Sequence, residues 1–399
     1  MNILSGKRIL DLSRLIPGSL CTLILADFGA EVIKVEDPLT GDYERHIPPF
    51  IQGVASRFLL LNRNKKSLTL NLKSSKGKEI FFGLAKKVDI IVENFRPGKT
   101  DELGIGYERI HEVNPSLIYC SLSSYGQDGP YRDEVGHDIN ILSVSGVLDM
   151  IQGRGGKPVI PGVQLADSIT GMYSALAILG ALLYREKTGR GQFLDISMLD
   201  GVVSWLFNSA RFYISNVPPP KSGKERLSGG LPNYNLYKTK DKRYIALGAL
   251  EKKFINTLLK YLGRKDLIDS ESNVTSTTVG GQRQRKIGDF LRKIFLTKTR
   301  DEWIRELGRL NICVSPVNTV EEGLSHPQVL HRQMVIERED SVLGRIKQIG
   351  IPMKFSETPG GIINTAPLLG AHSLEILRSI GYSEDEINDF IRERIVTSQ

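Results

Sequence analysis

The sequence predicts an α/β protein with a large Rossmann-like domain and a smaller α+β domain. Strand-like and helix-like patterns alternate through the first half of the chain, beginning with a β-α-β pattern over residues 7–36. A proline-rich stretch over residues 216–223 then precedes a segment that alternates like a hairpin. We therefore expect a large domain over residues 1–215, a linker over 216–232, a small domain over 233–318 and a return segment over 319–399 that completes the large domain.

Composition narrows the functional class. The chain has 399 residues, of which 40 % are hydrophobic and 25 % are charged, as is ordinary for soluble globular proteins. Its three cysteines show neither metal spacing nor a paired framework, which suits a reducing cytoplasm. The longest apolar run, residues 175–184, is well short of the ~20 residues that a membrane span needs, and the N-terminus has no signal-peptide pattern. We expect no membrane partner.

The net charge of +8 does not indicate a nucleic-acid partner, because the basic residues are scattered among acids and no binding motif accompanies them. A polyphosphate ligand explains the charge more economically.

The opening β-α-β unit indicates a Rossmann-like topology without the usual dinucleotide site. Its second strand ends at Glu36, where a dinucleotide fold places an acid on a ribose. The preceding turn, however, supplies a single glycine instead of G-x-G-x-x-G, so a nicotinamide site is not predicted.

The remaining helices and strands are predicted from the spacing of apolar residues and from the glycines and prolines that end such elements. In the large domain, strands are predicted over residues 8–12, 31–35, 68–72, 89–92, 117–121 and 192–198, and helices over 19–28, 75–86, 102–113, 168–185 and 199–214. In the small domain, a hairpin is predicted over 234–238 and 244–247, helices over 252–262, 286–295 and 299–310, a strand over 312–316, and a solvent-facing stretch over 269–285. Helices over 320–334 and 373–393 are predicted to return to the large domain.

Two residues are candidates for the chemistry. His137 lies in a Gly-His-Asp-Ile-Asn turn, and Asp167 stands just before the helix predicted over 168–185, at the N-cap position that Asp favours. Backbone N–H groups of that first turn would then be free to hold an oxyanion. An imidazole and a carboxylate facing each other across a pocket can act as base and acid on opposite faces of one carbon. The local sequence of each residue also fits a purely structural role, with Asp167 as a helix N-cap and His137 as a hydrogen-bonded or solvated loop residue.

A series of longer motifs sharpens this interpretation. They are, in chain order, KRILDLSRLIPG, LADFGAEVIKVEDP, NRNKKSLTLNLK, VENFRPG, NPSLIYCSLSSYGQDGPY, GHDIN, QLADSITG, KTGRGQFLDISMLDG, GALEKKF and CVSPV. With them the chain resembles the family III CoA-transferases (CaiB/BaiF), and within these the α-methylacyl-CoA racemase branch, over nearly its full length. The aspartate matching Asp167 is an acid/base in the racemases and an acyl-carrying nucleophile in the transferases. A histidine matching His137 is the racemase feature, since many transferases carry an aromatic or other residue there.

The resemblance implies the family's fold, an acyl-CoA substrate, an interlocked homodimer, and no metal or cofactor beyond the CoA moiety. It also implies that Glu251 reaches the catalytic histidine from the small domain of the partner chain. A carboxylate there would orient the imidazole and raise its basicity. The local sequence alone assigns Glu251 to the start of the helix predicted over 252–262.

The resemblance further implies the residues that hold CoA. The nucleotide is expected along Thr69, Leu70, Asn71, Leu72, Lys73, Glu93, Asn94, Phe95 and Arg96, and the thioester and pantetheine arm beside Gly126, Gln127 and Tyr131. Arg96 is the favoured phosphate ligand. Each of Lys65, Lys66 and Lys73, considered alone, is expected to be a solvent-exposed surface residue. Asp37 stands where close relatives often carry a basic residue that helps to hold the nucleotide.

The sequence therefore predicts a racemase or epimerase of 2-methyl-branched or otherwise α-substituted acyl-CoA thioesters. His137 and Asp167 would remove and return the α-proton through an enolate. The alternative is a CoA-transferase in which Asp167 attacks the acyl-CoA to form an acyl anhydride. A CoA-binding protein without catalysis is disfavoured because both candidate catalytic residues are in place.

Overall fold

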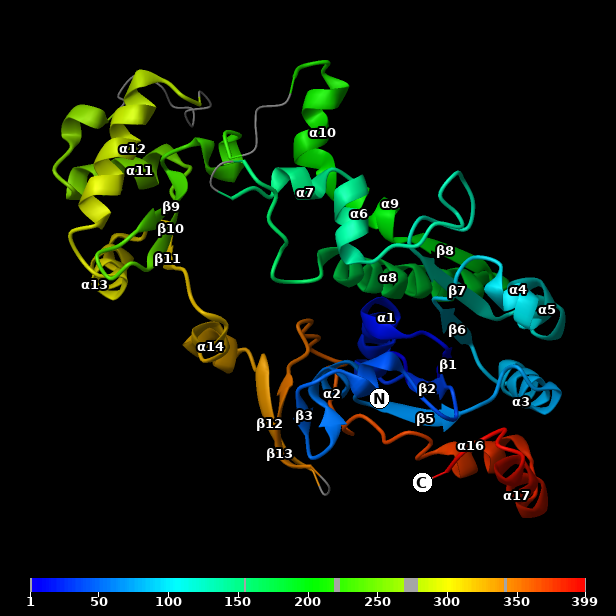
Figure 1. The fold of residues 1–399 in the computed structure, drawn as a ribbon. Coiled ribbons are helices and arrows are strands. Elements are labelled where there is room, and N and C mark those ends of the chain that lie inside the picture. Colours follow the sequence, from blue (N-terminus) through cyan, green and yellow to red (C-terminus); the bar gives the residue numbers. More distant parts are fainter. Residues whose placement is uncertain (1, 154–155, 219–222, 269–278, 341–342, 399) are drawn as a thin grey trace. The chain divides into compact units, whose positions relative to one another are not determined.

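The computed structural model describes residues 2–153, 156–218, 223–268, 279–340 and 343–398. The chain divides into two compact units (Figure 1). The larger comprises Met1–Val147, Pro161–Leu206 and Gln328–Gln399, and the smaller comprises Leu148–Ile160 and Phe207–Pro327. The predicted small domain, 233–318, falls inside the smaller unit, which also includes the predicted linker; residues 219–222 of that linker lie outside the described residues.

The larger unit is built on a six-stranded parallel sheet in the order β5-β2-β1-β6-β7-β8. The strands are β1 Arg8–Asp11, β2 Glu31–Glu36, β5 Lys65–Thr69, β6 Ile90–Glu93, β7 Ile118–Ser123 and β8 Phe193–Ser197. The chain runs outward from β1 in one direction through β2 and β5, and in the other through β6, β7 and β8. This reversal creates a topological switch point between β1 and β6, where open α/β sheets bind ligands. The predicted α/β class with a parallel sheet is confirmed.

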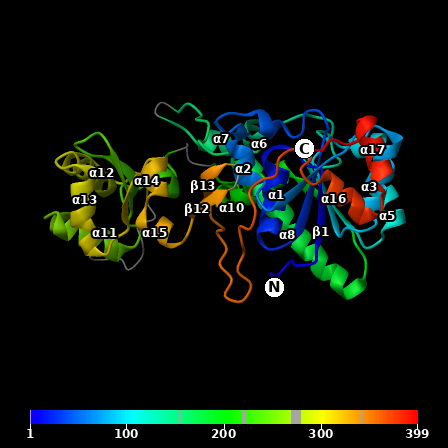
Figure 2. The ribbon, with the colours of Figure 1, turned by 90° about the horizontal axis from the view of Figure 1, so that it is seen from below.

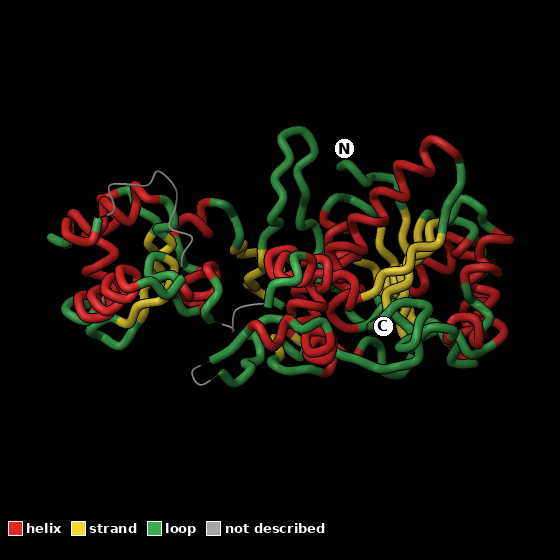
Figure 3. Tube along the Cα trace, turned by 90° about the horizontal axis from the view of Figure 1, so that it is seen from above, coloured by secondary structure: helices red, strands yellow, loops and turns green. Residues whose placement is uncertain are grey.

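Helices cover both faces of this sheet (Figure 3). The helices of the larger unit are α1 Leu15–Asp27, α2 Ser56–Leu61, α3 Ser75–Ala85, α4 Lys99–Leu103, α5 Tyr107–Val113, α6 Asp138–Val144, α8 Leu165–Thr188, α9 Met198–Val203, α16 Ser373–Ile380 and α17 Glu384–Arg392; α7 Val147–Met150 spans the point in the chain where the first unit gives way to the second. Neighbouring strand residues contribute to different cores: Leu10 packs in a cluster with α3, α5, α16 and α17, and Ile9 in a cluster with α1 and α8. Both faces of the sheet are therefore buried, which explains continuous apolar runs such as Ile90 to Val92.

Helix α8 packs along α1 (Figure 2). A Cβ atom at Gly171 would lie 2.8 Å from the carbonyl oxygen of Pro17, so glycine permits this close approach. By length and composition α8 would be apolar enough to cross a membrane, but half of its most apolar stretch is buried within the protein. A core helix of a soluble protein has the same properties.

The smaller unit contains a three-stranded antiparallel sheet in the order β11-β10-β9. Its elements are α10 Phe207–Ile214, β9 Tyr234–Lys238, β10 Tyr244–Gly248, α11 Lys252–Tyr261, α12 Gln282–Phe295, α13 Arg300–Leu307, β11 Val314–Pro316 and α14 Val320–Leu324, followed by α15 Pro327–His331 at the border between the units. The predicted hairpin is confirmed, and its turn places Lys242 at φ +64°. Residues 269–278 of the predicted solvent-facing stretch lie outside the described residues.

Several predicted elements differ from the observed ones. The helix predicted over 102–113 is two helices, because Gly104 adopts a left-handed φ of +74° and ends the first one. The strand predicted over 68–72 starts earlier, at Lys65, because its pairing with β2 sets the register from Val32 onward. Two antiparallel hairpins were not predicted. They are β3 Phe50–Ile51 with β4 Val54–Ala55, and β12 Val335–Asp340 with β13 Gly344–Ile349.

Candidate functional site

A cavity of about 520 Å³ opens at the carboxyl ends of β1, β6 and β7. His137 and Asp167 both line it, so the structure brings the two candidate catalytic residues to one cavity. The other lining residues are Leu15, Pro17, Asn94, Phe95, Arg96, Pro97, Leu122, Ser123, Ser124, Arg132, Glu134, Val135, Gly136, Asn140 and Met198. The cavity lies at the switch point of the sheet, where the topology alone predicts a ligand site.

His137 immediately precedes α6 and is held by its neighbours on both sides. Its backbone N–H donates to Oδ1 of Asn140 at 3.0 Å. The carbonyl oxygen of Gly136 accepts from the hydroxyl of Ser124 at 3.1 Å. The imidazole is exposed, so a ligand in the cavity can reach it.

Asp167 lies in the first turn of α8, which begins at Leu165 after the N-cap residue Gln164. The prediction that Asp167 is the N-cap was therefore wrong. The capping anion is Asp138, whose Oδ1 accepts from the N–H groups of Ala166 at 2.6 Å and Asp167 at 3.2 Å. A carboxylate from another helix thus accepts hydrogen bonds from the N–H groups in the first turn of α8. The local sequence does not encode such a tertiary contact. The prediction that these amides are free for an oxyanion was also wrong.

The pKa of Asp167 is raised to about 6, mainly by burial and also by the nearby carboxylate of Asp138. His137 and Arg57 act in the opposite direction, because positive charge favours the ionised carboxylate. A carboxyl group with this pKa holds and releases a proton near neutral pH, as an acid/base catalyst must.

A second cavity of about 400 Å³ lies at the carboxyl ends of β1, β2 and β5. The residues predicted to hold the nucleotide that line it are Leu70, Asn71, Leu72, Lys73 and Phe95; the rest of its lining is Leu12, Arg14, Val35, Glu36, Asp37, Thr40, Tyr43, Lys99 and Leu103. Phe95 lines both cavities, so the two cavities are adjacent. We name the second one the nucleotide cavity and the first one the catalytic cavity.

Of the other residues predicted to hold the nucleotide, Asn94 and Arg96 line the catalytic cavity, whereas Thr69 and Glu93 line neither cavity. Thr69 is buried and its Oγ1 donates to the carbonyl of Thr397 at 2.8 Å, so it fixes the C-terminal segment. Glu93 is also buried and accepts from the N–H of Phe95 at 2.7 Å. Burial raises the pKa of Glu93 to about 7. Its hydrogen bond to the N–H of Phe95 fixes the loop that carries Phe95.

The glycine-rich loop after β7 is tied to the sheet. The N–H of Gly126 donates to Oγ of Ser123 at 2.9 Å, and Nε2 of Gln127 donates to Oγ of Ser121 at 2.8 Å. The ring of Tyr131 packs edge-on against Tyr125. None of the three predicted ligand residues of this loop lines the two cavities, and their contact with the pantetheine arm stays a prediction.

Glu251 precedes α11 in the smaller unit, whereas His137 and Asp167 belong to the larger unit. Its carbonyl oxygen accepts from the N–H of Phe254 at 3.0 Å, but its carboxylate does not cap the helix. The side chain is exposed, and its predicted contact with the histidine of a partner chain stays a prediction.

The interpretation of Lys65 as a solvated residue was wrong. Its Nζ is buried and donates to Oδ1 of Asn62 at 2.8 Å and to Oδ2 of Asp11 at 3.2 Å. Glu36 is also buried, and Arg45 binds both of its carboxylate oxygens. Neither side chain is therefore available to a nucleotide. Among the described residues, no group of three or more His, Cys, Asp and Glu side chains is placed to hold a metal.

Sequence reasoning missed three charged residues: Arg14 and Arg132, which line the cavities, and Asp138, which binds the N–H of Asp167. Asp138 follows His137 directly within the GHDIN motif, and Arg14 lies in KRILDLSRLIPG, so motif membership was the available signal. Arg132 lines the catalytic cavity and its Nε donates to the carbonyl of Gln127 at 3.0 Å. No local pattern distinguishes Arg132 from a surface arginine.

Comparison with known proteins identifies the family. The family model described as CoA-transferase family III matches residues 4–373. The chain belongs to CoA-transferase family III. A crystal structure of a CaiB/BaiF family protein from Brucella suis has a TM-score of 0.83 to this chain at 29 % identity, covering 95 % of this chain and 100 % of that one. The fold is therefore that of the CaiB/BaiF family.

Relatives within family III carry both kinds of name. Human succinyl-CoA:glutarate CoA-transferase is 35 % identical over 98 % of this chain and 90 % of its own length. Human alpha-methylacyl-CoA racemase is 34 % identical over 99 % of this chain and 98 % of its own length. Overall identity therefore does not separate a racemase from a transferase, and the residues of the catalytic cavity must decide.

Proposed function

We propose that this family III enzyme is a racemase or epimerase of 2-methyl-branched or otherwise α-substituted acyl-CoA thioesters. The observation that carries the proposal is that His137 and Asp167 line one cavity. The α-proton of a thioester is acidic enough to be removed when the enolate is stabilised, and two acid/base groups on opposite faces invert the carbon. We expect a homodimer in the cytoplasm, and the reaction uses no cofactor beyond the CoA moiety.

In the proposed reaction one residue removes the α-proton and the other delivers a proton to the opposite face. When neutral His137 accepts the proton, the protonated carboxyl of Asp167 supplies one, and the reverse reaction exchanges these roles. Both directions leave the total number of protons unchanged. The raised pKa of Asp167 supports this role, because a carboxyl near pKa 6 is present in both forms close to neutral pH.

The enolate oxygen needs a hydrogen-bond donor, and the amides of Ala166 and Asp167 already donate to Asp138. Within the described chain, the N–H of Asp138 has no protein acceptor. This amide follows His137 directly, and we assign the enolate oxygen to it. Loss of one such donor typically costs ~10²- to 10³-fold in rate.

CoA transfer is the alternative, and it is favoured by relatives such as the human CoA-transferase. In that reaction the ionised carboxylate of Asp167 attacks the thioester carbonyl, and the C–S bond breaks to release CoA and leave an acyl anhydride. A nucleophilic carboxylate works best when it is fully ionised. The raised pKa of Asp167 fits proton transfer but does not exclude attack, because a carboxyl with a pKa of about 6 is still mostly ionised at neutral pH.

The test incubates the enzyme with each enantiomer of a 2-methylacyl-CoA in D₂O, without added carboxylate, and reads α-deuterium by mass spectrometry. The racemase proposal predicts deuterium at the α-carbon from both enantiomers, with intact thioester. In a parallel reaction, hydroxylamine traps any acyl anhydride. An Asp167 hydroxamate with release of CoA, and no α-deuterium, would establish the transferase instead.

A further inference from the structure

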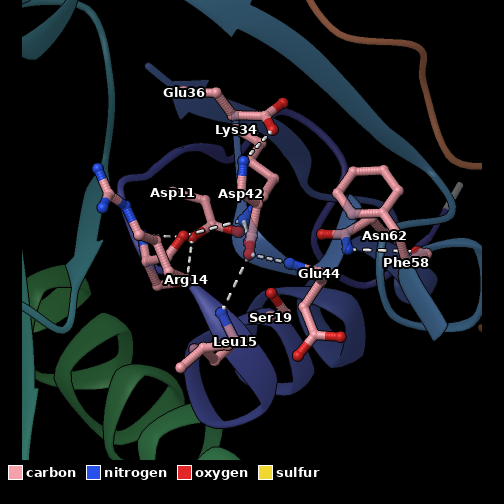
Figure 4. Close-up of polar contacts among 12 residues, drawn as sticks. Asp11, Arg14, Leu15, Ser19, Lys34, Glu36, Asp42, Glu44, Phe58 and Asn62 are labelled. Atoms are coloured by element: carbon pink, nitrogen blue, oxygen red, sulfur yellow. Dashed lines mark hydrogen bonds and ion pairs between the residues drawn. The ribbon is translucent and has the colours of Figure 1, made fainter. Parts of the chain in front are cut away.

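The turn from β1 into α1, residues 13–15, is held by buried charged side chains (Figure 4). Ser13 donates through its N–H to Oδ1 of Asp11 at 3.0 Å, and its carbonyl accepts from Nζ of Lys34 at 2.9 Å. The N–H of Leu15 donates to Oδ1 of Asp42 at 3.4 Å. Lys34 and Asp42 form an ion pair at 2.8 Å and are both buried. Buried groups thus fix the residues on either side of Arg14.

The conformation of this turn requires such support. Leu15 has φ +63°, in the left-handed region that residues with a Cβ rarely adopt. The surrounding hydrogen bonds hold it there, and its side chain lines the catalytic cavity. The neighbouring Arg14 lines the nucleotide cavity. One constrained turn therefore contributes successive residues to the two adjacent cavities.

Arg14 itself is fixed at the backbone and oriented at the side chain. Asn94 accepts from its N–H at 2.9 Å and donates to its carbonyl at 2.8 Å. The guanidinium carbon lies 5.2 Å from the ring centre of Tyr43 and 5.9 Å from that of Phe95. One guanidinium nitrogen donates to the hydroxyl of Tyr43 at 3.1 Å. In Figure 4 the side chain points away from the buried charges, so they do not compete for its remaining N–H groups.

Each of the two anions that line the nucleotide cavity has hydrogen-bond partners other than Arg14. Oδ1 of Asp37 accepts from the amides of Leu39 at 2.9 Å and Thr40 at 3.1 Å, in its own loop. Glu36 is paired with Arg45 at 2.7 Å. Neither anion forms an ion pair with Arg14, although the charge of Arg14 helps to lower the pKa of Asp37.

The other cations of the cavity are placed differently. Nζ of Lys99 is paired with Glu102 at 2.6 Å, and Lys73 is exposed to solvent. Arg14 combines an uncommitted guanidinium edge with a fixed backbone and two flanking aromatic rings. A guanidinium stacked in this way keeps its edge N–H groups for a planar, two-bond contact with a phosphate.

We propose that Arg14 binds a phosphate of the CoA nucleotide and is the principal phosphate ligand of the nucleotide cavity. The apolar side chains of Leu70, Leu72 and Leu103 line the same cavity and suit the adenine ring. This inference rests on CoA being the ligand, as in the proposed function, but it does not depend on which reaction follows binding.

The test measures binding of CoA, 3′-dephospho-CoA and pantetheine by calorimetry to the wild type and to Arg14→Gln. We expect the substitution to weaken CoA binding about 10- to 100-fold, the range for losing hydrogen bonds to a charged group, and to leave pantetheine binding unchanged. An equal loss for CoA and 3′-dephospho-CoA assigns the contact to the pyrophosphate. A loss for CoA alone assigns it to the 3′-phosphate. Either pattern supports the proposal.

The matched control is Arg109→Gln. Arg109 is an exposed arginine whose guanidinium also lies over an aromatic ring, that of Phe82, but it lines neither cavity. Unchanged CoA affinity in Arg14→Gln, or an equal loss in Arg109→Gln, would overturn the proposal. If Arg14→Gln does not fold, Arg14→Lys tests the same claim, because lysine keeps the positive charge but lacks the planar guanidinium that makes two parallel hydrogen bonds. Full CoA affinity in Arg14→Lys would also overturn the proposal. Because binding is measured without turnover, failure of the racemase proposal would leave this result intact.

Discussion

Asp138 caps the helix that carries Asp167. Its carboxylate accepts from the N–H of Asp167 at 3.2 Å and from that of Ala166 at 2.6 Å, although the two aspartates are 29 positions apart in the sequence. Because Asp138 follows His137 directly, this contact ties the turn of one candidate base to the helix of the other. It also places a like charge near Asp167, which contributes to the raised pKa of that carboxyl.

Replacing Asp138 by Ala should therefore lower both stability and activity. The amides of Ala166 and Asp167 would lose their acceptor, at a cost of ~1 kcal/mol in the free energy of unfolding. Asp138→Asn keeps an oxygen acceptor and should recover most of that stability, while its lost charge lowers the pKa of Asp167. Urea unfolding measures the first effect and the pH dependence of the rate measures the second. Wild-type stability in Asp138→Ala would contradict the capping role.

The raised pKa of Asp167 makes the stability of the protein depend on pH. The carboxyl ionises at about pH 6 in the folded chain, compared with its ordinary value of 3.8. Between these values the folded state binds more protons than the unfolded state, so the free energy of unfolding falls as the pH rises from about 4 to about 6. Asp167→Asn should remove this component. Urea unfolding of both proteins across pH 4–7 measures it, and parallel curves for the two proteins would contradict the pKa assignment.

The predicted role of Glu251 in a partner chain can be tested by mixing two inactive variants. If Glu251 serves the histidine of the other chain, a heterodimer of His137→Ala with Glu251→Gln contains one intact site. Co-expression with two affinity tags isolates this heterodimer, and its activity should approach half that of the wild type. If Glu251 serves its own chain, both sites are defective and the heterodimer is inactive. An active monomer by light scattering would contradict both the dimer and this role.

The local sequence was sufficient for the parts of the fold that follow local rules. Strands were predicted over residues 8–12 and 89–92, and β1 and β6 of the parallel sheet confirm them. Asp167 was correctly expected near the start of α8, but its exact position depended on Asp138, which arrives from another helix.

Tertiary contacts explain the other differences. Lys65 belongs to a basic, polar motif, and its burial is compensated by Asp11 and Asn62, which accept hydrogen bonds from its Nζ. Arg14 became a candidate ligand because Tyr43 and Phe95, from two other segments, flank its guanidinium. Sequence patterns report which face of an element is apolar. They do not report which distant side chains meet at a loop.

The central claim is that His137 and Asp167 act on opposite faces of one α-carbon, and enantiomer-resolved deuterium exchange in D₂O tests it most directly. His137→Ala should stop exchange from one enantiomer and leave some exchange of the other through Asp167, and Asp167→Asn should show the mirror pattern. Net racemisation should fall by ~10²- to 10⁴-fold in each variant, the usual cost of losing a general acid or base. If one substitution abolishes exchange of both enantiomers while the other leaves racemisation near the wild-type rate, the paired roles of His137 and Asp167 are contradicted.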